Sequence, residues 1–222
     1  MGDRVILVNF WSSMFGARVK IALKEKGVSY EEKMEHLPNK TLLLLEMNPV
    51  HKRVPVLIHN GKPICGSLII IEYIDQVWND RASFFPEDPF ARTQARFWAD
   101  FVDRKLYDNC RRIVWHQSKE EAEKAKDETI ENLRALEGAL GDEPYFGGDV
   151  FGFVDIALIG FYSWFQTYEA FGDFSIEAEC PKIIAWAKRC LERDTVSTSL
   201  AGDPNKVYGL AMSVRKTFGL DG

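Results

Sequence analysis

The chain has 222 residues and a formal net charge of −5, with 46% hydrophobic and 27% charged residues. This length fits one large domain or two small ones and allows a sizeable core. The negative charge makes nucleic acid or an anionic membrane surface a poor partner for the whole molecule. No apolar run approaches the ~20 residues that span a bilayer. We therefore expect neither a nucleic-acid partner nor a membrane partner.

The N-terminus does not resemble a secretory signal, because its apolar run is short and lacks a small-residue cleavage site. The cysteines have no CxxC spacing and the histidines no metal-ligand spacing, so no metal site is indicated. These residues are Cys65, Cys110, Cys180, Cys190, His36, His51, His59 and His116. We expect a cytoplasmic protein with free thiols, and structural or surface roles for the four histidines.

The first 80 residues alternate strand and helix signals. The pattern predicts a strand at 4–10, a helix at 15–27, a strand at 29–36, a helix at 39–49, a hairpin at 54–65 and a helix at 67–80. Asn60-Gly61 between two apolar arms is typical of a tight hairpin turn. The resulting βαβαββα order is that of a thioredoxin-like domain. In this fold a cis bond before Pro55 would turn the backbone of Val54 toward a bound peptide.

Residues 81–89 are polar and carry prolines, which is typical of a domain boundary. We therefore expect a thioredoxin-like domain at 1–80, a linker at 81–89 and an all-helical domain at 90–222. The helices predicted after the linker are 90–117, 119–140, 153–171, 182–192 and 204–218. Asp155, at the start of one of them, fits a carboxylate that accepts backbone N–H groups better than an acid catalyst.

Ser13 lies between the first strand and the first helix, where thioredoxin-like folds place a reactive cysteine. It can be a helix N-cap, or its hydroxyl can donate to a ligand sulfur beside the helix N-terminus. Lowering the pKa of a thiol from about 8.5 by one to two units needs roughly 1.4–2.8 kcal/mol, which these features can supply. Lys40 and Arg53, unless they are solvated surface charges, would complete an anion cradle with Ser67 at another helix N-terminus.

The segments 9–27, 47–65, 67–75, 145–158 and 179–190 resemble a plant tau-class glutathione S-transferase, in order and over essentially the whole chain. The stretch MNPVHKRVPVL is the most specific. The resemblance implies a cytoplasmic homodimer and a transferase (EC 2.5.1.18) that joins its co-substrate glutathione to small hydrophobic electrophiles. It also implies roles in xenobiotic detoxification and stress response, a peroxidase side activity, and no permanently bound cofactor.

By this resemblance Ser13 is the catalytic hydroxyl. The glutathione site would contain Lys40, Arg53, Val54, Pro55, Gly66 and Ser67. The electrophile pocket would contain Phe10, Phe15, Tyr107, Arg111, Trp115 and Trp164, although aromatic residues in such patterns are as readily part of a core. Tyr107, Arg111 and Trp115 recur at helical spacing on a helix that should face the first domain.

This chain departs from the family pattern in two places. Ser12 and Met14 replace the prolines that usually flank the serine, and Gly66 replaces a glutamate that binds the γ-glutamyl ammonium of glutathione. We therefore expect an active enzyme with weak glutathione binding. A ligandin-like binding protein for apolar metabolites is the alternative. A glutathione-dependent oxidoreductase is disfavoured, because it would need cysteine at position 13. Cys65, beside the site, is expected to be an inert core thiol.

Overall fold

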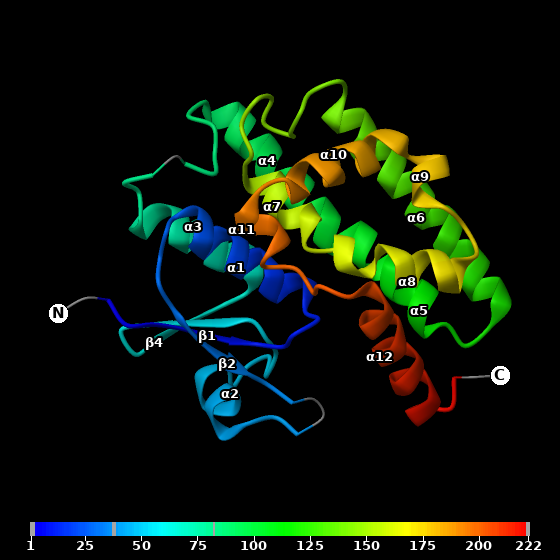
Figure 1. Cartoon of the computed structure of the whole chain (residues 1–222), viewed down its shortest axis with the longest axis horizontal. Coiled ribbons are helices and arrows are strands. Elements are labelled where there is room, and N and C mark those ends of the chain that lie inside the picture. The colour runs from blue at the N-terminus through cyan, green and yellow to red at the C-terminus, as the bar shows by residue number, and fades with distance from the viewer. Residues whose placement is uncertain (1–2, 37–38, 82, 221–222) are drawn as a thin grey trace.

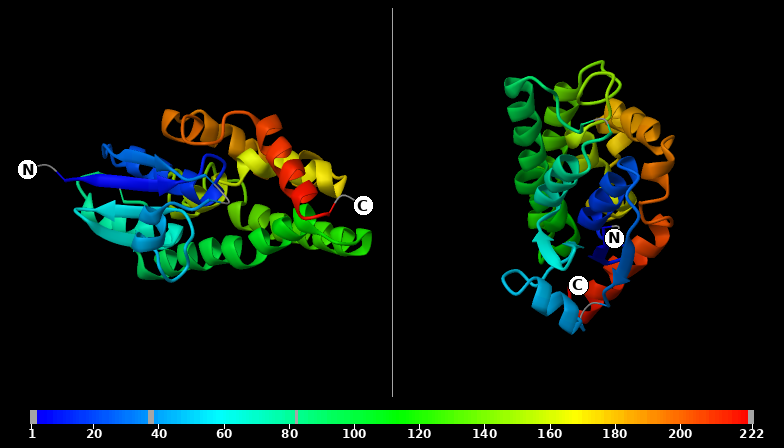
Figure 2. Two further views of the ribbon diagram at one scale, coloured as in Figure 1. Left: turned by 90° about the horizontal axis from the view of Figure 1, so that it is seen from below. Right: turned by 90° about the vertical axis from the view of Figure 1, so that its left-hand side faces the viewer.

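The computed structural model describes residues 3–36, 39–81 and 83–220. The thioredoxin-like part occupies one end of the molecule, and the helical part the other (Figure 2). In chain order the first part contains β1 (Val5–Asn9), α1 (Met14–Glu25), β2 (Glu31–Met34), α2 (Leu42–Met47), β3 (Val56–His59), β4 (Lys62–Cys65) and α3 (Ser67–Val77). This is the predicted βαβαββα order.

The four strands form one mixed sheet in the order β2-β1-β3-β4. β1 pairs parallel with β2 and antiparallel with β3, and β3 pairs antiparallel with β4. Asn60 and Gly61 both have positive φ, so the predicted hairpin turn is confirmed. α1 and α3 cover one face of the sheet and α2 covers the other (Figure 1). Leu44 of α2 closes a small core on that second face, packed against Val8 and Val56.

Within the described residues, all the named elements after α3 are helices, which confirms the predicted all-α second part. The elements are α4 (Pro89–Phe101), the π-helical turn η1 (Val102–Leu106), α5 (Tyr107–Trp115), α6 (Lys119–Leu140), α7 (Phe153–Ile159), α8 (Tyr162–Gly172), α9 (Ile176–Glu179), α10 (Pro181–Leu191), α11 (Asp194–Ser197) and α12 (Pro204–Thr217). Within the described residues, no helix is long and apolar enough to cross a membrane.

Two of the predicted helices differ from those observed. The helix predicted at 90–117 contains the π turn η1, which a search for a 3.6-residue period does not detect. The single helix predicted at 153–171 was wrong, because the chain breaks at Gly160 between α7 and α8. A β-carbon at Gly160 would lie 2.4 Å from the carbonyl oxygen of Met14, so glycine permits a close backbone contact there. The short helices α9 and α11 were not predicted.

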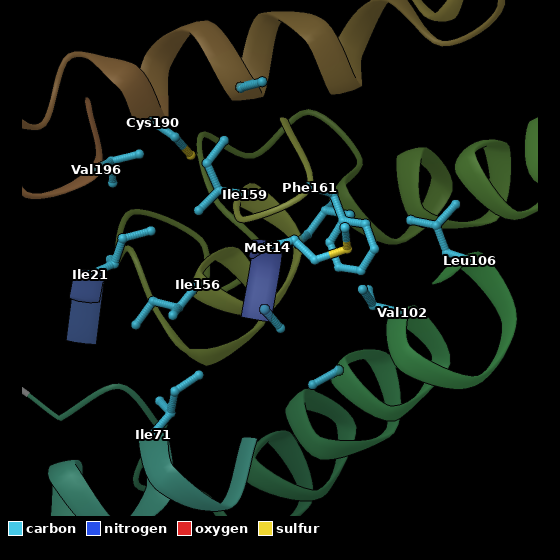
Figure 3. Close-up of a cluster of buried hydrophobic side chains, with 14 of the residues drawn as sticks. Met14, Ile21, Ile71, Val102, Leu106, Ile156, Ile159, Phe161, Cys190 and Val196 are labelled. Carbon is cyan, nitrogen blue, oxygen red and sulfur yellow. The ribbon is translucent and has the colours of Figure 1, made fainter. Parts of the chain in front are cut away.

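A shared hydrophobic core joins the two parts. Figure 3 shows Met14 and Ile21 of α1 and Ile71 of α3 gathered with side chains of η1, α7, α10 and α11. Trp164 of α8 adds a polar link, because its indole N–H donates to the carbonyl of Ser12 at 2.8 Å. The junction between β1 and α1 is therefore held by residues more than 100 positions away in the sequence.

Candidate active site

A cavity of about 210 Å³ opens between the start of α1, the loop before β3, the start of α3 and η1. Six of the residues expected at the site line it, and these are Phe15, Arg53, Val54, Pro55, Gly66 and Ser67. Three further residues line it, namely Asn48, His51 and Asp103, and of these the sequence indicated only Asp103, as a candidate carboxylate supplied by a partner subunit. His51, expected to be structural or at the surface, is thus an exposed residue at the cavity.

Ser13 is the N-cap of α1, and its Oγ accepts the backbone N–H of Gly16 at 3.0 Å. The hydroxyl hydrogen is not used by this bond, so it can still be donated to a ligand. Gly16 allows the buried side chain of Asn9 to pack under the turn, because a β-carbon at Gly16 would lie 1.7 Å from Asn9 Oδ1. The structure thus has Ser13 as a cap and leaves its donor function available.

Asn48 shapes the loop that carries the cationic side of the cavity. Its buried side chain donates to the carbonyl of Arg53 at 2.9 Å and accepts the backbone N–H of His51 at 3.1 Å. Between them, Lys52 adopts a positive φ. The Val54–Pro55 bond that follows is cis, the isomer considered from the sequence. The Asn-Pro pair at the end of the predicted helix 39–49 was the available signal for this turn.

Gly66 and Ser67 form the start of α3. Gly66 is the N-cap, with φ +90° and no side chain to cap the helix. Ser67 is already inside the helix, and its Oγ accepts a hydrogen bond from Arg18 Nη1 at 3.0 Å. The first-turn amides of α3 are therefore without a side-chain cap at the cavity, where a carboxylate is favoured.

Arg18 was not predicted, and it joins both parts of the chain behind the cavity. Its guanidinium is fully buried, donates through Nε to the carbonyl of Ala157 at 2.6 Å, and forms an ion pair with Asp103 at 2.7 Å. It also lies over the rings of Phe15 and Phe161. Arg18 stands four residues before Ala22 and therefore shares the apolar face of α1. This position in the sequence was the signal for a buried arginine. Asp103 belongs to the π turn, which brings its carboxylate to the cavity.

Phe15 connects the cavity to α5. Its ring makes an edge-to-face contact with the ring of Tyr107, with 4.9 Å between centroids. Burial raises the pKa of the Tyr107 hydroxyl, and the charges of Arg111 and Arg53 oppose this rise. The Tyr107 hydroxyl is therefore protonated at neutral pH and available as a donor. Arg111, one turn further along α5, is exposed and pairs with Asp108 at 3.4 Å.

The other expected site residues lie outside the lining of this cavity. Lys40 is exposed in the loop before α2, and Phe10 and Trp115 are half-buried. Trp164 is buried under the Ser13 turn, with its N–H occupied by Ser12. The structure therefore gathers the glutathione-site residues more closely than the set expected for the electrophile pocket.

The sequence also predicted structural roles for Asp155 and Cys65. Asp155 accepts the backbone N–H groups of Gly152 and Phe146 and the indole N–H of Trp186. Burial raises its pKa to about 6, and these bonds oppose the rise. The helix-start interpretation of Asp155 is confirmed.

Cys65 is half-buried and burial raises the pKa of its thiol, as expected of an inert thiol. Across the described residues no cluster of three metal-ligating side chains is found.

Comparisons with known proteins identify the family of this chain. Residues 3–76 match the family model of the glutathione S-transferase N-terminal domain, and residues 89–194 match that of the C-terminal domain. The chain is 60% identical over 220 residues to the probable glutathione S-transferase parC of Nicotiana tabacum, covering 99% of each chain. It is 56% identical over 221 residues to glutathione S-transferase U25 of Arabidopsis thaliana, covering 100% of this chain and 99% of the relative.

Solved structures lead to the same family. Rice GST1 (OsGSTU1), crystallised in complex with glutathione, superposes with a TM-score of 0.92 at 42% identity, covering 98% of this chain and 99% of that one. The tau-class glutathione S-transferase of mango, Mangifera indica, has a TM-score of 0.89 at 37% identity, covering 95% of this chain and 98% of that one.

The chain belongs to the glutathione S-transferase family, a fold with a thioredoxin-like domain followed by a helical one. Within that family it is a member of the plant tau class, and it is a glutathione transferase (EC 2.5.1.18). The ligandin-like alternative is not favoured by these relatives.

Proposed function

We propose that the cavity binds glutathione and that Ser13 stabilises its thiolate for attack on small hydrophobic electrophiles. The sulfur forms a bond to an electrophilic carbon, the leaving group departs with the bonding electrons, and the thiol proton goes to solvent. Attack of the same thiolate on a peroxide oxygen would give the peroxidase side activity, with a second glutathione reducing the oxidised sulfur to a disulfide.

The observation that carries the proposal is the arrangement of donors around the cavity. Arg53 and the uncapped start of α3 offer positive charge for two separate carboxylates. Phe15, which lines the cavity, is two residues from Ser13, whose hydroxyl hydrogen remains free to donate. A tripeptide with a carboxylate at each end and a thiol between them fits this order of groups. Lys40 would add charge from the exposed loop before α2.

The electrophile would bind on the α5 side of the thiol. Tyr107 contacts Phe15, and its protonated hydroxyl can donate to a polar group of the electrophile or of the leaving group. Phe10, Arg111 and Trp115 would complete the wall, and Trp164 would support the Ser13 turn from behind. This assignment favours flat apolar electrophiles that pack against aromatic rings.

We further propose a cytosolic homodimer. The candidate dimer surface spans the helices at 72–78 and 92–103. There Arg96 forms a two-point ion pair with Glu72, linking α4 to α3 across the exposed face. Phe97 beside this pair is 55% exposed, which is high for a large apolar side chain. The four free cysteines are consistent with a reducing compartment.

Initial rates of glutathione conjugation with an aromatic halide, corrected for the uncatalysed rate, test the proposed activity. Binding of an apolar dye to the same preparation tests the ligandin-like alternative: dye binding without turnover would contradict the transferase mechanism. Sedimentation at micromolar concentration tests the dimer, and a species of only 25.4 kDa would contradict it.

A further inference from the structure

Glu35, directly after β2, is a buried acidic residue that the proposed mechanism does not use. It is only 2% exposed. Burying a carboxylate is costly unless hydrogen bonds compensate, so its partners show what it holds. Both of its oxygens accept bonds from Thr41, Oε2 from the backbone N–H at 3.0 Å and Oε1 from the hydroxyl. Glu35 therefore holds the single residue Thr41 at two points.

Thr41 links this carboxylate to the start of α2. It is the N-cap of that helix, because its Oγ1 accepts the backbone N–H of Leu44 at 3.2 Å. Leu44 is fully buried in the core on the same face of the sheet. On the other side, the backbone N–H of Glu35 donates to the carbonyl of Asn9, at the end of β1, at 2.7 Å. The start of α2 is thus tied through Glu35 to the strand that leads into Ser13.

The bond from the Thr41 N–H also fixes the backbone of Lys40. That N–H belongs to the planar peptide group that joins Lys40 to Thr41. Lys40 is exposed, and among the described residues its ammonium has no ion-pair partner. Because Glu35 uses both oxygens on Thr41, it holds the backbone of Lys40 without neutralising its charge. The ammonium is therefore available to an anionic group of a ligand.

The other end of α2 has its own anchor. Asn48 is the C-cap of the helix, and its side chain donates to the carbonyl of Arg53 at 2.9 Å. α2 thus lies between the two cations proposed to bind glutathione, Lys40 before it and Arg53 after it. A helix of six residues has little stability of its own, so its place depends on Leu44 and on the anchors at its two ends.

On the basis of the glutathione site proposed above, we propose that Glu35 is a positioning residue for Lys40. Glu35 does not contact the ligand. It fixes the start of α2 relative to Ser13, so that the Lys40 ammonium meets a carboxylate of the thiol tripeptide at a set distance from the thiol. Glu35 thereby strengthens glutathione binding and leaves the chemical step nearly unchanged.

Glutathione conjugation at saturating 1-chloro-2,4-dinitrobenzene separates binding from chemistry. Glu35→Ala removes both bonds to Thr41 and should raise KM for glutathione about threefold, with kcat within about twofold of the wild type. Glu35→Gln keeps an uncharged acceptor of similar size, so its KM should rise by less than about twofold. Calorimetric binding of S-methylglutathione repeats the comparison without chemistry. Wild-type glutathione binding by Glu35→Ala would overturn the proposal.

Ser118→Ala is the control for lost stability. Ser118 caps α6 by accepting the backbone N–H of Glu121 at 3.2 Å, and it does not line the cavity. Its KM for glutathione should equal that of the wild type. A rise as large as that of Glu35→Ala would overturn the proposal, because loss of any helix anchor would then be sufficient.

A double-mutant cycle shows whether Glu35 acts through Lys40. In a Lys40→Ala background, Glu35→Ala should change KM for glutathione by less than about 1.5-fold, because the group that it positions is gone. A further threefold rise would overturn the proposal, and so would wild-type glutathione binding by Lys40→Ala. If Glu35→Ala folds poorly, Thr41→Val, which removes the hydroxyl bond alone, enters the same cycle with an expected rise of about twofold. Failure of the proposed function differs from all of these, since the wild type would then show no turnover above the uncatalysed rate.

Discussion

Helices α1 and α3 each have a serine at their start, yet the two serines make different contacts, and of the two only Ser67 lines the cavity. Ser13 precedes α1 and caps it by accepting the N–H of Gly16. Ser67 is the first residue of α3 and accepts from Arg18 instead. The amides at the start of α1 are therefore partly satisfied by the protein, while those of α3 lack a side-chain cap. This difference suits a thiolate next to α1, held by a hydroxyl, and a carboxylate on α3, held by backbone amides.

Arg18 links the two helix starts, because it belongs to α1 and donates to Ser67 of α3. Replacing Arg18 with Met breaks this link most severely. It leaves Asp103 without its cation and the Ala157 carbonyl without its donor, and we expect a loss of about 2–4 kcal/mol in the free energy of unfolding. Urea unfolding measures this. The matched variant Asp103→Asn keeps both other bonds of Arg18 but leaves its fully buried guanidinium without a counter-charge, so we expect a loss of comparable size. Wild-type stability of Asp103→Asn would contradict this assignment.

Ser13→Ala tests the start of α1. Loss of the hydroxyl donor should lower kcat by about tenfold or more, with a smaller change in glutathione binding. The same change removes the N-cap and should cost about 1 kcal/mol of stability. Ser13→Thr keeps both the hydroxyl and the cap and serves as the control. If Ser13→Ala has wild-type kcat and only a lowered melting temperature, Ser13 is a cap and nothing more.

Arg53→Ala and Lys40→Ala test the proposed cationic contacts to a carboxylate of glutathione. Contacts to a carboxylate are the same in the ground and transition states, so these changes should raise KM for glutathione more than they lower kcat. We expect about five- to tenfold for Arg53, which lines the cavity, and less for Lys40, which is exposed outside the lining. Normal glutathione binding by both variants would mean that the ligand lies elsewhere.

The sequence was sufficient for the order of elements in the thioredoxin-like part, because alternation of apolar residues, Asn60-Gly61 and the prolines are local signals. It predicted Ser13, Arg53 and Ser67 because each stands beside a recognisable strand or helix end. It indicated Asp103 only as a carboxylate from a partner subunit, since the π turn that brings Asp103 to the cavity of its own chain has no separate hydrophobic period. It also missed the break at Gly160, where the chain lies against the backbone of Met14, 146 positions earlier.

The same limit applies to the electrophile pocket. Trp164 has the aromatic character expected of a pocket wall, but its indole N–H is bonded to Ser12 behind the turn. Tyr107, in the same predicted set, contacts Phe15 at the cavity. Both residues are aromatic and lie in predicted helices, so the sequence does not distinguish a pocket wall from a core position. Only the packing of α5 and α8 against α1 separates them, and that packing depends on contacts between distant parts of the chain.

Variants of Gly66 should give the smallest effect on glutathione binding, and they test how the start of α3 differs from that of α1. Its φ of +90° disfavours any residue with a β-carbon, so Gly66→Glu and Gly66→Ala should each lose about 1–3 kcal/mol of stability. Only Gly66→Glu adds a carboxylate for the γ-glutamyl ammonium. Solvent exposure of this wall reduces the value of that bond, so we expect Gly66→Glu to bind glutathione about three- to fivefold more tightly than Gly66→Ala. Calorimetry with S-methylglutathione measures this difference, and binding of an apolar dye should be nearly equal in the two variants. If Gly66→Glu binds no better than Gly66→Ala, the absence of a carboxylate at this position does not limit glutathione affinity, and the uncapped start of α3 alone holds the γ-glutamyl end.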